Sequence, residues 1–164
     1  MRERIFLVGF MCSGKTTVGR IVAQKLRWDF VDTDEEIEKR EGFSIPEIFE
    51  KKGEDYFRRL ELEVLKELSK RRKVVVSTGG GLGANPEAME LMKDKGLVVW
   101  LPISYEEFIK RCGKDGSRPL LKKGEEELRR LLSERNKIYS HAHLKLPPGE
   151  PEELARRILS LSQP

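Results

Sequence analysis

The residues from Gly9 to Thr16 carry the strongest chemical signal in this sequence. They read G-F-M-C-S-G-K-T, a complete G-x-x-x-x-G-K-[ST] pattern between an apolar run and a helical periodicity. Glycines let the backbone curl until several N–H groups converge on phosphate oxygens, and the start of a helix adds partial positive charge. Lys15 would reach the β- and γ-phosphates, and Thr16 would offer its hydroxyl to Mg²⁺. A chance glycine turn with a surface lysine is the alternative, but motif and context together predict a nucleotide-binding loop, the P-loop. The predicted contacts here are Cys12, Ser13, Gly14, Lys15, Thr16 and Thr17.

Two absences narrow the class of P-loop protein. Motor-type ATPases and many switch GTPases carry an acid at the end of a buried strand, but the apolar run at 74–76 continues into Ser77 and Thr78. Guanine recognition requires N-K-x-D, and residues 136–139 read N-K-I-Y, without the Asp that pairs with the base. A metal-binding acid must therefore come from elsewhere, and guanine specificity is not expected.

The missing carboxylates occur in Asp32-Thr33-Asp34, directly after an apolar run at 30–31. In a parallel sheet the carboxyl ends of strands open onto the ligand crevice, and strand residues i and i+2 share a face. Asp32 would then hold the hydration shell of Mg²⁺, while Asp34 would accept or orient the proton of an attacking hydroxyl. The alternative is a helix N-cap, since Thr33 or Asp34 precedes a helical segment at 35–40. From the residues alone, the site role of Asp32 and Asp34 and the helix N-cap are equally favoured.

The elements that must position these residues alternate between strands and helices. Continuous apolar runs predict strands buried on both faces at 5–8, 30–31, 74–76 and 97–101, with a weaker candidate at 144–146. Apolar stripes predict helices at 18–26, 57–68, 128–138 and 154–161. Ser44 and Glu47 form a capping box that opens another helix. The alternation indicates an α/β fold with a mainly parallel sheet, and 164 residues match one domain.

Composition argues against several other classes of protein. Charged residues make up 37% of the chain with a net charge of +4, but the two signs alternate in short runs, which is typical of solvated helix faces rather than a nucleic-acid patch. No apolar run approaches the ~18 residues of a membrane span. The apolar segment at 5–12 runs into Gly14 and Lys15 without a signal cleavage site. We expect a cytoplasmic monomer without a membrane or nucleic-acid partner.

Cysteine and histidine suggest no metal centre. Cys12 and Cys112 are too few for a metal cluster and fit no C-x-x-C pattern. A disulfide between them is not expected in a chain without an export signal. His141 and His143 alternate as on a strand but lack a third ligand at suitable spacing, so surface positions are expected.

Together the motifs resemble the shikimate kinase family. The matching pieces, in the family's order and approximate spacing, are the P-loop, Asp32-Thr33-Asp34, Phe57-Arg58 with Glu61, the glycines at 79–81, Arg118-Pro119-Leu120-Leu121, and Glu134-Arg135 followed by Tyr139. The resemblance covers nearly the whole chain. It implies a single-domain P-loop NTPase, like the nucleoside monophosphate kinases, with a central five-stranded parallel sheet, flanking helices and a mobile lid at about 112–124. It also implies that ATP, with Mg²⁺, phosphorylates the 3-hydroxyl of shikimate, a step of aromatic amino-acid biosynthesis.

The resemblance assigns roles on the acid-substrate side. Asp34 would bind the ring hydroxyls near the reacting oxygen, and the glycine run would let the backbone approach the ring. Arg58 and Arg135 would clamp the carboxylate, which a guanidinium grips bidentately. Taken alone, Arg58 could instead be a surface cation paired with Glu54 or Glu61, and the glycines only a flexible turn. The predicted substrate contacts are Asp34, Arg58, Gly79, Gly80, Gly81 and Arg135.

On the nucleotide side, the resemblance implies that Arg118 in the lid approaches the β- and γ-phosphates and offsets the charge of the transferring group. It places Arg111 against adenine and Pro151 near a second adenine-side loop. An ordinary surface loop is the alternative for the lid. The predicted catalytic residues are Lys15, Asp34 and Arg118.

The chain departs from the family pattern in two places. Cys12 stands where the family usually has glycine, which would restrict the backbone or add an oxidation-sensitive thiol near the phosphates. Residues 136–137 lack the proline usual before Tyr139, and 140–146 lack the usual acidic character, so the last strand is the weakest part of the match.

Three other functions remain open. A related small-molecule kinase such as gluconate kinase shares the P-loop, lid and size. A nucleoside monophosphate kinase would need a second base pocket, whereas Arg58 and Arg135 already suit a carboxylate. An ATP-sensing module would bind nucleotide without transfer. Acceptor-dependent release of ADP separates these functions.

Overall fold

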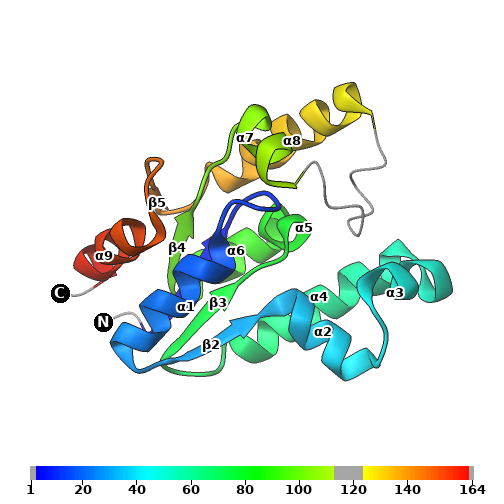
Figure 1. The fold of residues 1–164 in the computed structure, drawn as a ribbon. Helices are drawn as coiled ribbons and strands as arrows, with labels where there is room; N and C mark the ends of the chain where they lie inside the picture. Colours follow the sequence, from blue (N-terminus) through cyan, green and yellow to red (C-terminus); the bar gives the residue numbers. More distant parts are fainter. Residues whose placement is uncertain (1–2, 113–123, 163–164) are drawn as a thin grey trace.

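A five-stranded parallel sheet forms the centre of the computed structural model, which describes residues 3–112 and 124–162 (Figure 1). The strands are β1 (Arg4–Val8), β2 (Asp29–Asp32), β3 (Val74–Ser77), β4 (Leu97–Trp100) and β5 (Leu144–Lys145). Their order is β2-β3-β1-β4-β5, and every neighbouring pair is parallel. The predicted α/β class with five parallel strands is therefore confirmed, including the weak last strand. The predicted lid lies outside the described residues except for Cys112 and Gly124.

Helices cover both faces of the sheet (Figure 1). They are α1 (Lys15–Leu26), α2 (Thr33–Glu41), α3 (Ile45–Lys52), α4 (Glu54–Leu68), α5 (Gly80–Gly83), α6 (Pro86–Lys95), α7 (Tyr105–Cys112), α8 (Glu125–Tyr139) and α9 (Pro151–Ser162). None of the described helices is long and apolar enough to cross a membrane.

The two faces of the sheet divide the core in two. Ile5 and Leu7 of β1 pack with Val18 of α1 and Ile158 of α9. Their strand neighbours point the other way, into a larger cluster with α4, α6, α7 and α8. Because side chains alternate along a strand, the continuous apolar runs Ile5–Val8 of β1, Val74–Val76 of β3 and Leu97–Trp100 of β4 bury both faces of the sheet.

The sequence predicted most helices but not all. The stripes behind α1, α4, α8 and α9 and the capping box at Ser44 form helices as predicted. α5, α6 and α7 were not predicted, because helices of 4, 10 and 8 residues are too short to show a sustained helical periodicity. Asn85 caps α6 through hydrogen bonds from the backbone N–H groups of Glu87 and Ala88, and Ser104 accepts one from Glu107 at the start of α7.

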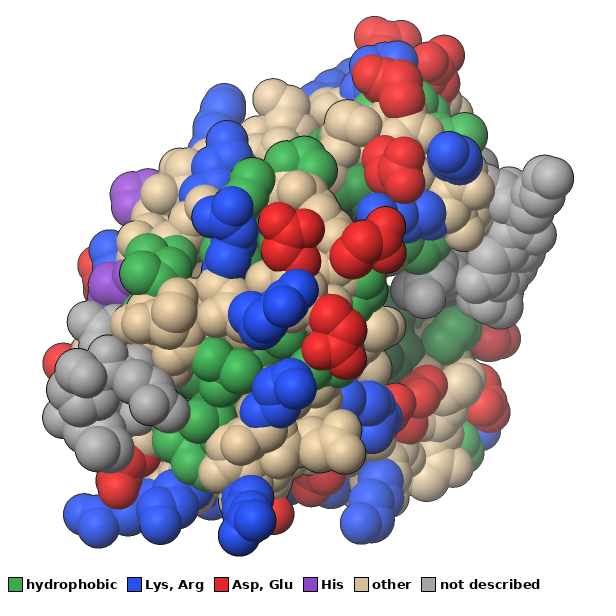
Figure 2. All heavy atoms as spheres, turned by 60° about the vertical axis from the view of Figure 1, so that its left-hand side comes forward, with side chains coloured by type: hydrophobic (Ala, Val, Ile, Leu, Met, Phe, Trp, Pro, Cys, Tyr) green, Lys and Arg blue, Asp and Glu red, His purple; other side chains and the backbone are tan. Residues whose placement is uncertain are grey.

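Charges on the face that carries α9 and β5 are mixed. Figure 2 shows basic and acidic side chains interspersed there, with no broad field of one sign. His141 is exposed, while His143 is half-buried and accepts a hydrogen bond at Nδ1 from the Val98 backbone. The surface position expected for the histidines therefore holds for His141, whereas His143 also ties the last strand region to β4.

Candidate active site

The P-loop connects β1 to α1 at the carboxyl edge of the sheet. Gly14 is the N-cap of α1 with φ 95°, a left-handed conformation that favours glycine, and no side chain caps the first turn. No side chain occupies this helix start, which is the kind of position that binds an anion. Lys15 is 9% exposed, and its Nζ donates to the carbonyls of Gly9 (2.7 Å) and Phe10 (3.0 Å).

Ser13 adds an unsatisfied polar atom to this loop. Its Oγ is buried and makes no hydrogen bond with the described residues. A buried hydroxyl without a partner is costly. A phosphate at the loop would remove that cost. Thr17, also predicted to bind ATP, is exposed at the first turn of α1.

Asp32 takes the helix-capping role that the sequence left open, and it also contacts the P-loop. It is the N-cap of α2, where its carboxylate accepts from the backbone N–H groups of Asp34 (2.9 Å) and Glu35 (3.2 Å). Its other oxygen accepts a hydrogen bond from Thr16 Oγ1 at 3.0 Å. The cap therefore fixes the carboxylate beside the P-loop hydroxyl. The expectation of Thr33 or Asp34 as the cap was wrong.

Asp34 reaches the site from a helix and not from a strand. α2 begins at Thr33, so the i and i+2 argument for a shared strand face was wrong, although both carboxylates lie near the P-loop edge. Burial, with a smaller contribution from the Asp32 carboxylate, raises the pKa of Asp34 to about 6. Asp34 is therefore an ionised carboxylate at neutral pH that takes up a proton more readily than an exposed one.

Three consecutive glycines bring the predicted acid-substrate residues together. A Cβ on Gly79 would overlap the Asp34 carboxylate, and one on Gly81 would overlap the Arg58 guanidinium. A Cβ on Gly80 would lie 2.9 Å from Nη1 of Arg135 and 3.9 Å from the Gly9 carbonyl of the P-loop. We call residues 79–81 the glycine corner. It lets three charged side chains from α2, α4 and α8 converge on the end of β3, next to the P-loop.

A cavity of about 280 Å³ opens beside the glycine corner. Its lining includes the charged side chains of Arg58, Arg135 and Glu134. Burial lowers the pKa of Arg135, but a guanidinium remains protonated throughout the working range of an enzyme. The cavity therefore offers two fixed cations to a small anion.

Glu61 belongs to this site, although the sequence reading gave it no role beyond pairing with Arg58. It is 2% exposed, and its Oε1 accepts from Arg58 Nη1 at 2.7 Å. Burial raises the pKa of Glu61 to about 7, even though the Arg58 guanidinium acts in the opposite direction. The signal in the sequence was a carboxylate among the apolar positions 57, 60, 64 and 65 of one helix face. Glu61 orients Arg58 toward the glycine corner, so Arg58 is not merely a surface cation.

Tyr139 holds the glycine corner from the opposite side. Its side chain is fully buried, and its hydroxyl donates to the Gly80 carbonyl at 2.7 Å. Burial raises the pKa of Tyr139, so the hydroxyl keeps its proton for this bond. The C-terminal half of α8 thus supplies both Arg135 and the tyrosine that anchors the Gly80 peptide.

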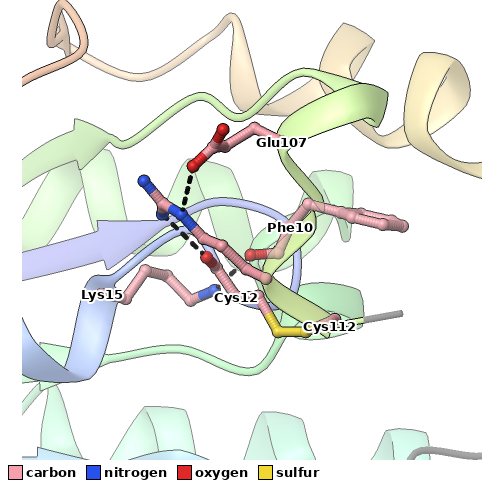
Figure 3. The surroundings of a disulfide bond; sticks show 6 residues. Phe10, Cys12, Lys15, Glu107 and Cys112 are labelled. Carbon is pink, nitrogen blue, oxygen red and sulfur yellow. Dashed lines mark hydrogen bonds and ion pairs between the residues drawn. A yellow bond between two sulfur atoms is a disulfide. The ribbon is translucent and has the colours of Figure 1, made fainter. Parts of the chain in front are cut away.

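The nucleotide side contains an unexpected covalent link. A disulfide joins Cys12 in the P-loop to Cys112 at the end of α7, 100 residues apart, so the expectation of no disulfide was wrong (Figure 3). Arg111 donates to Glu107 (2.9 Å) and to the Cys12 carbonyl (3.0 Å). Pro151 begins α9, which packs against α1. The adenine contacts of Arg111 and Pro151 stay predictions, and Arg118 lies outside the described residues.

Comparison with known proteins agrees with this geometry. A family model described as shikimate kinase matches residues 11–162. A shikimate kinase from Aquifex aeolicus (strain VF5) is 56% identical over 158 residues, covering 95% of this chain and 94% of its own length.

The chain belongs to the shikimate kinase family. The predicted family and the predicted class of enzyme are thereby confirmed. The crystal structure of shikimate kinase from Aquifex aeolicus vf5 superposes with a TM-score of 0.88 at 54% identity, covering 96% of this chain and 94% of that one. Shikimate kinase from Acinetobacter baumannii in complex with shikimate superposes with a TM-score of 0.91 at 42% identity, covering 98% and 93%.

Proposed function

We propose that this protein transfers the γ-phosphate of ATP to the 3-hydroxyl of shikimate, with the P-loop holding the nucleotide and the glycine corner holding the acid. The observation that carries the proposal is the convergence of Asp34, Arg58 and Arg135 on three glycines beside the P-loop. Membership of the shikimate kinase family supports the same substrate and reaction.

The charges at the glycine corner suit a small hydroxylated carboxylic acid. Arg58 and Arg135 would bind the carboxylate through charge-assisted hydrogen bonds, which are the strong ones. The Asp34 carboxylate can only accept when ionised, so it would bind a hydroxyl and not a second anion. Cations at one end and an acceptor at the other define one orientation of the acid.

Phosphoryl transfer asks little covalent chemistry of these residues. As the substrate oxygen bonds to the γ-phosphorus, its proton passes to a carboxylate oxygen of Asp34, and the bond to the β-γ bridging oxygen of ATP breaks. Lys15 and the first backbone N–H groups of α1 would offset the charge on the β- and γ-phosphates. Most of the rate acceleration would therefore come from position and electrostatics.

Thr16 and Asp32 are the residues that would hold Mg²⁺. The Thr16 hydroxyl and the Asp32 carboxylate meet at 3.0 Å beside the P-loop, and oxygen ligands are those that Mg²⁺ prefers. The described residues contain no group of three or more His, Cys, Asp or Glu that could hold a metal, which suits an ion bound mainly through water and phosphate. When bound, Mg²⁺ would neutralise charge on the β- and γ-phosphates.

Acceptor-dependent release of ADP tests the proposal. Purified protein with Mg·ATP is supplied with shikimate, gluconate, a nucleoside monophosphate or no acceptor, and ³¹P NMR locates the phosphate on the product. We expect ADP release only with shikimate, and a phosphate on the 3-hydroxyl. ADP release with another acceptor would overturn the acid-side assignment. ADP release at the same rate when no acceptor is present would mean that the protein is an ATPase.

A further inference from the structure

The P-loop and α7 are joined by three contacts besides backbone packing. The first is the Cys12–Cys112 disulfide (Figure 3). The second is the hydrogen bond from Arg111 to the Cys12 carbonyl at 3.0 Å. The third is an edge-to-face pair of Phe10 and Phe108, with ring centroids 5.0 Å apart. Two of the three do not depend on the sulfur atoms, so they would keep the two cysteines close after the disulfide opens.

Cys12 occupies a backbone conformation that does not favour cysteine. Its φ is 62°, in the left-handed region that L-residues other than glycine, Asn and Asp rarely adopt. It directly precedes Ser13, Gly14 and Lys15, whose backbone shapes the P-loop. A free Cys12 would therefore pull the loop toward other conformations, whereas a bond to the end of α7 holds it in this one.

We propose that Cys12 and Cys112 form a reversible thiol–disulfide site, taking a low-molecular-weight disulfide or dithiol as its reagent, and that the disulfide strengthens ATP binding by holding the P-loop in shape. This inference rests on the proposed binding of ATP at the P-loop. The Cα atoms of the two cysteines are 6.3 Å apart, within the range that a disulfide spans.

The exposure of the two cysteine residues sets the order of the reaction. Cys112 is 1% exposed, while Cys12 is half-buried. The Cys12 thiolate therefore attacks one sulfur of the small disulfide, the reagent's S–S bond breaks, and one thiol leaves. The Cys112 thiol then loses its proton and attacks the Cys12 sulfur, which expels the second thiol. Two protein thiols are oxidised and one small disulfide is reduced to two thiols; a dithiol reverses both steps.

ATP affinity in the two redox states tests the inference. The purified protein is equilibrated with excess oxidised glutathione or with dithiothreitol, free thiols are counted with a chromogenic reagent, and Kd for ATP and for shikimate is measured by calorimetry. We expect no free thiol after oxidation and two after reduction. Reduction should raise Kd for ATP by about five- to thirtyfold, the scale of one unfavourable left-handed residue, while Kd for shikimate changes less than twofold.

Two variants separate the sulfur bond from general effects of the reductant. Cys112→Ser cannot close the intramolecular bond, so it should bind ATP like the reduced protein in dithiothreitol and should gain no affinity in oxidised glutathione, where Cys12 stops at the mixed disulfide. Cys12→Gly should bind ATP equally in both conditions and at least as tightly as the reduced protein, because glycine adopts positive φ without cost. Circular dichroism checks that both variants fold.

Three results would each contradict a different part of the inference. Two free thiols after oxidation would overturn the site, and an unchanged or lower Kd for ATP after reduction would overturn its coupling to the nucleotide. Absence of ATP binding in both states would instead overturn the proposed function of the P-loop.

Discussion

The nucleotide side and the acid side of this site are built in opposite ways. The P-loop is one continuous stretch from Gly9 to Thr16, and it would act mainly through backbone N–H groups and a single lysine. The acid side combines residues 34, 58, 61, 79–81 and 135 from four separate helices and their connections, and it would act through charged side chains, of which Arg58 and Glu61 are paired with each other. A local motif can be read from a string of residues, whereas the acid side depends on where the fold brings distant residues.

The same difference predicts different kinetic defects. Damage to the P-loop should affect the transferring phosphate and hence kcat, while damage to the cationic part of the acid side should affect KM for the acid. A change at Asp34 should affect both constants, because the proposed function places this carboxylate against both the acid and the reacting oxygen.

Lys15→Met should have the largest effect. Lys15 is the only lysine among residues 9–16 of the P-loop, and methionine keeps the side-chain length without the charge. We expect kcat to fall by roughly 10³-fold or more, since groups that offset charge on the transferring phosphate contribute on that scale. Steady-state ADP release is the measurement. Lys25→Met, at an exposed position on the same helix, is the control and should leave kcat within twofold.

Asp34→Asn should be the next largest, with a loss of about 10²- to 10³-fold in kcat, because the amide cannot accept the proton of the hydroxyl. In the unaltered enzyme the raised pKa of about 6 means that activity falls as pH drops below 6, where Asp34 becomes protonated. A kcat/KM profile from pH 5 to 8 measures this limb. Asp94→Asn, an exposed acid, should keep it; persistence of the limb in Asp34→Asn would assign it to another group.

Arg58→Ala should weaken acid binding without a comparable loss of kcat. Removing one of two cations from a buried carboxylate contact costs about 1.5–3 kcal/mol, or roughly 10- to 100-fold in KM for shikimate. Arg59→Ala removes the same charge from the exposed neighbour and should leave KM unchanged. Equal KM values for the two variants would contradict the carboxylate clamp.

Gly81→Ala should give the smallest effect of the series. Its new methyl group would meet the Arg58 guanidinium, a flexible group that can move aside at the expense of its pairing with Glu61. We expect KM for shikimate to rise by about three- to tenfold, on the scale of one perturbed hydrogen bond. Gly149→Ala is the matched control, since its Cβ would make only ordinary contacts from 3.4 Å. A loss of kcat with unchanged KM would show that the glycine corner serves the phosphate and not the acid.

Most of the fold could be predicted because its signals are local. The strands appeared as continuous apolar runs, because both of their faces are buried. Four long helices appeared as apolar stripes, because burial of one helix face places an apolar residue every three or four positions. α5, α6 and α7 were missed because short helices repeat their apolar positions over too few turns to be recognised. α7 mattered for the site, since it carries Arg111 and Cys112 to the P-loop.

By itself, the sequence determined the P-loop, the sheet and the family, because a phosphate loop and buried strands impose residue types at fixed local spacing. Only the tertiary structure decided that Asp34 enters from a helix and that Glu61 is a buried partner of Arg58. It also decided that each glycine of the corner faces one charged side chain, and that Cys12 meets Cys112. Those facts depend on contacts between residues up to 100 positions apart. Packing and electrostatics act through space there, so such contacts produce no repeating pattern of residue types along the sequence.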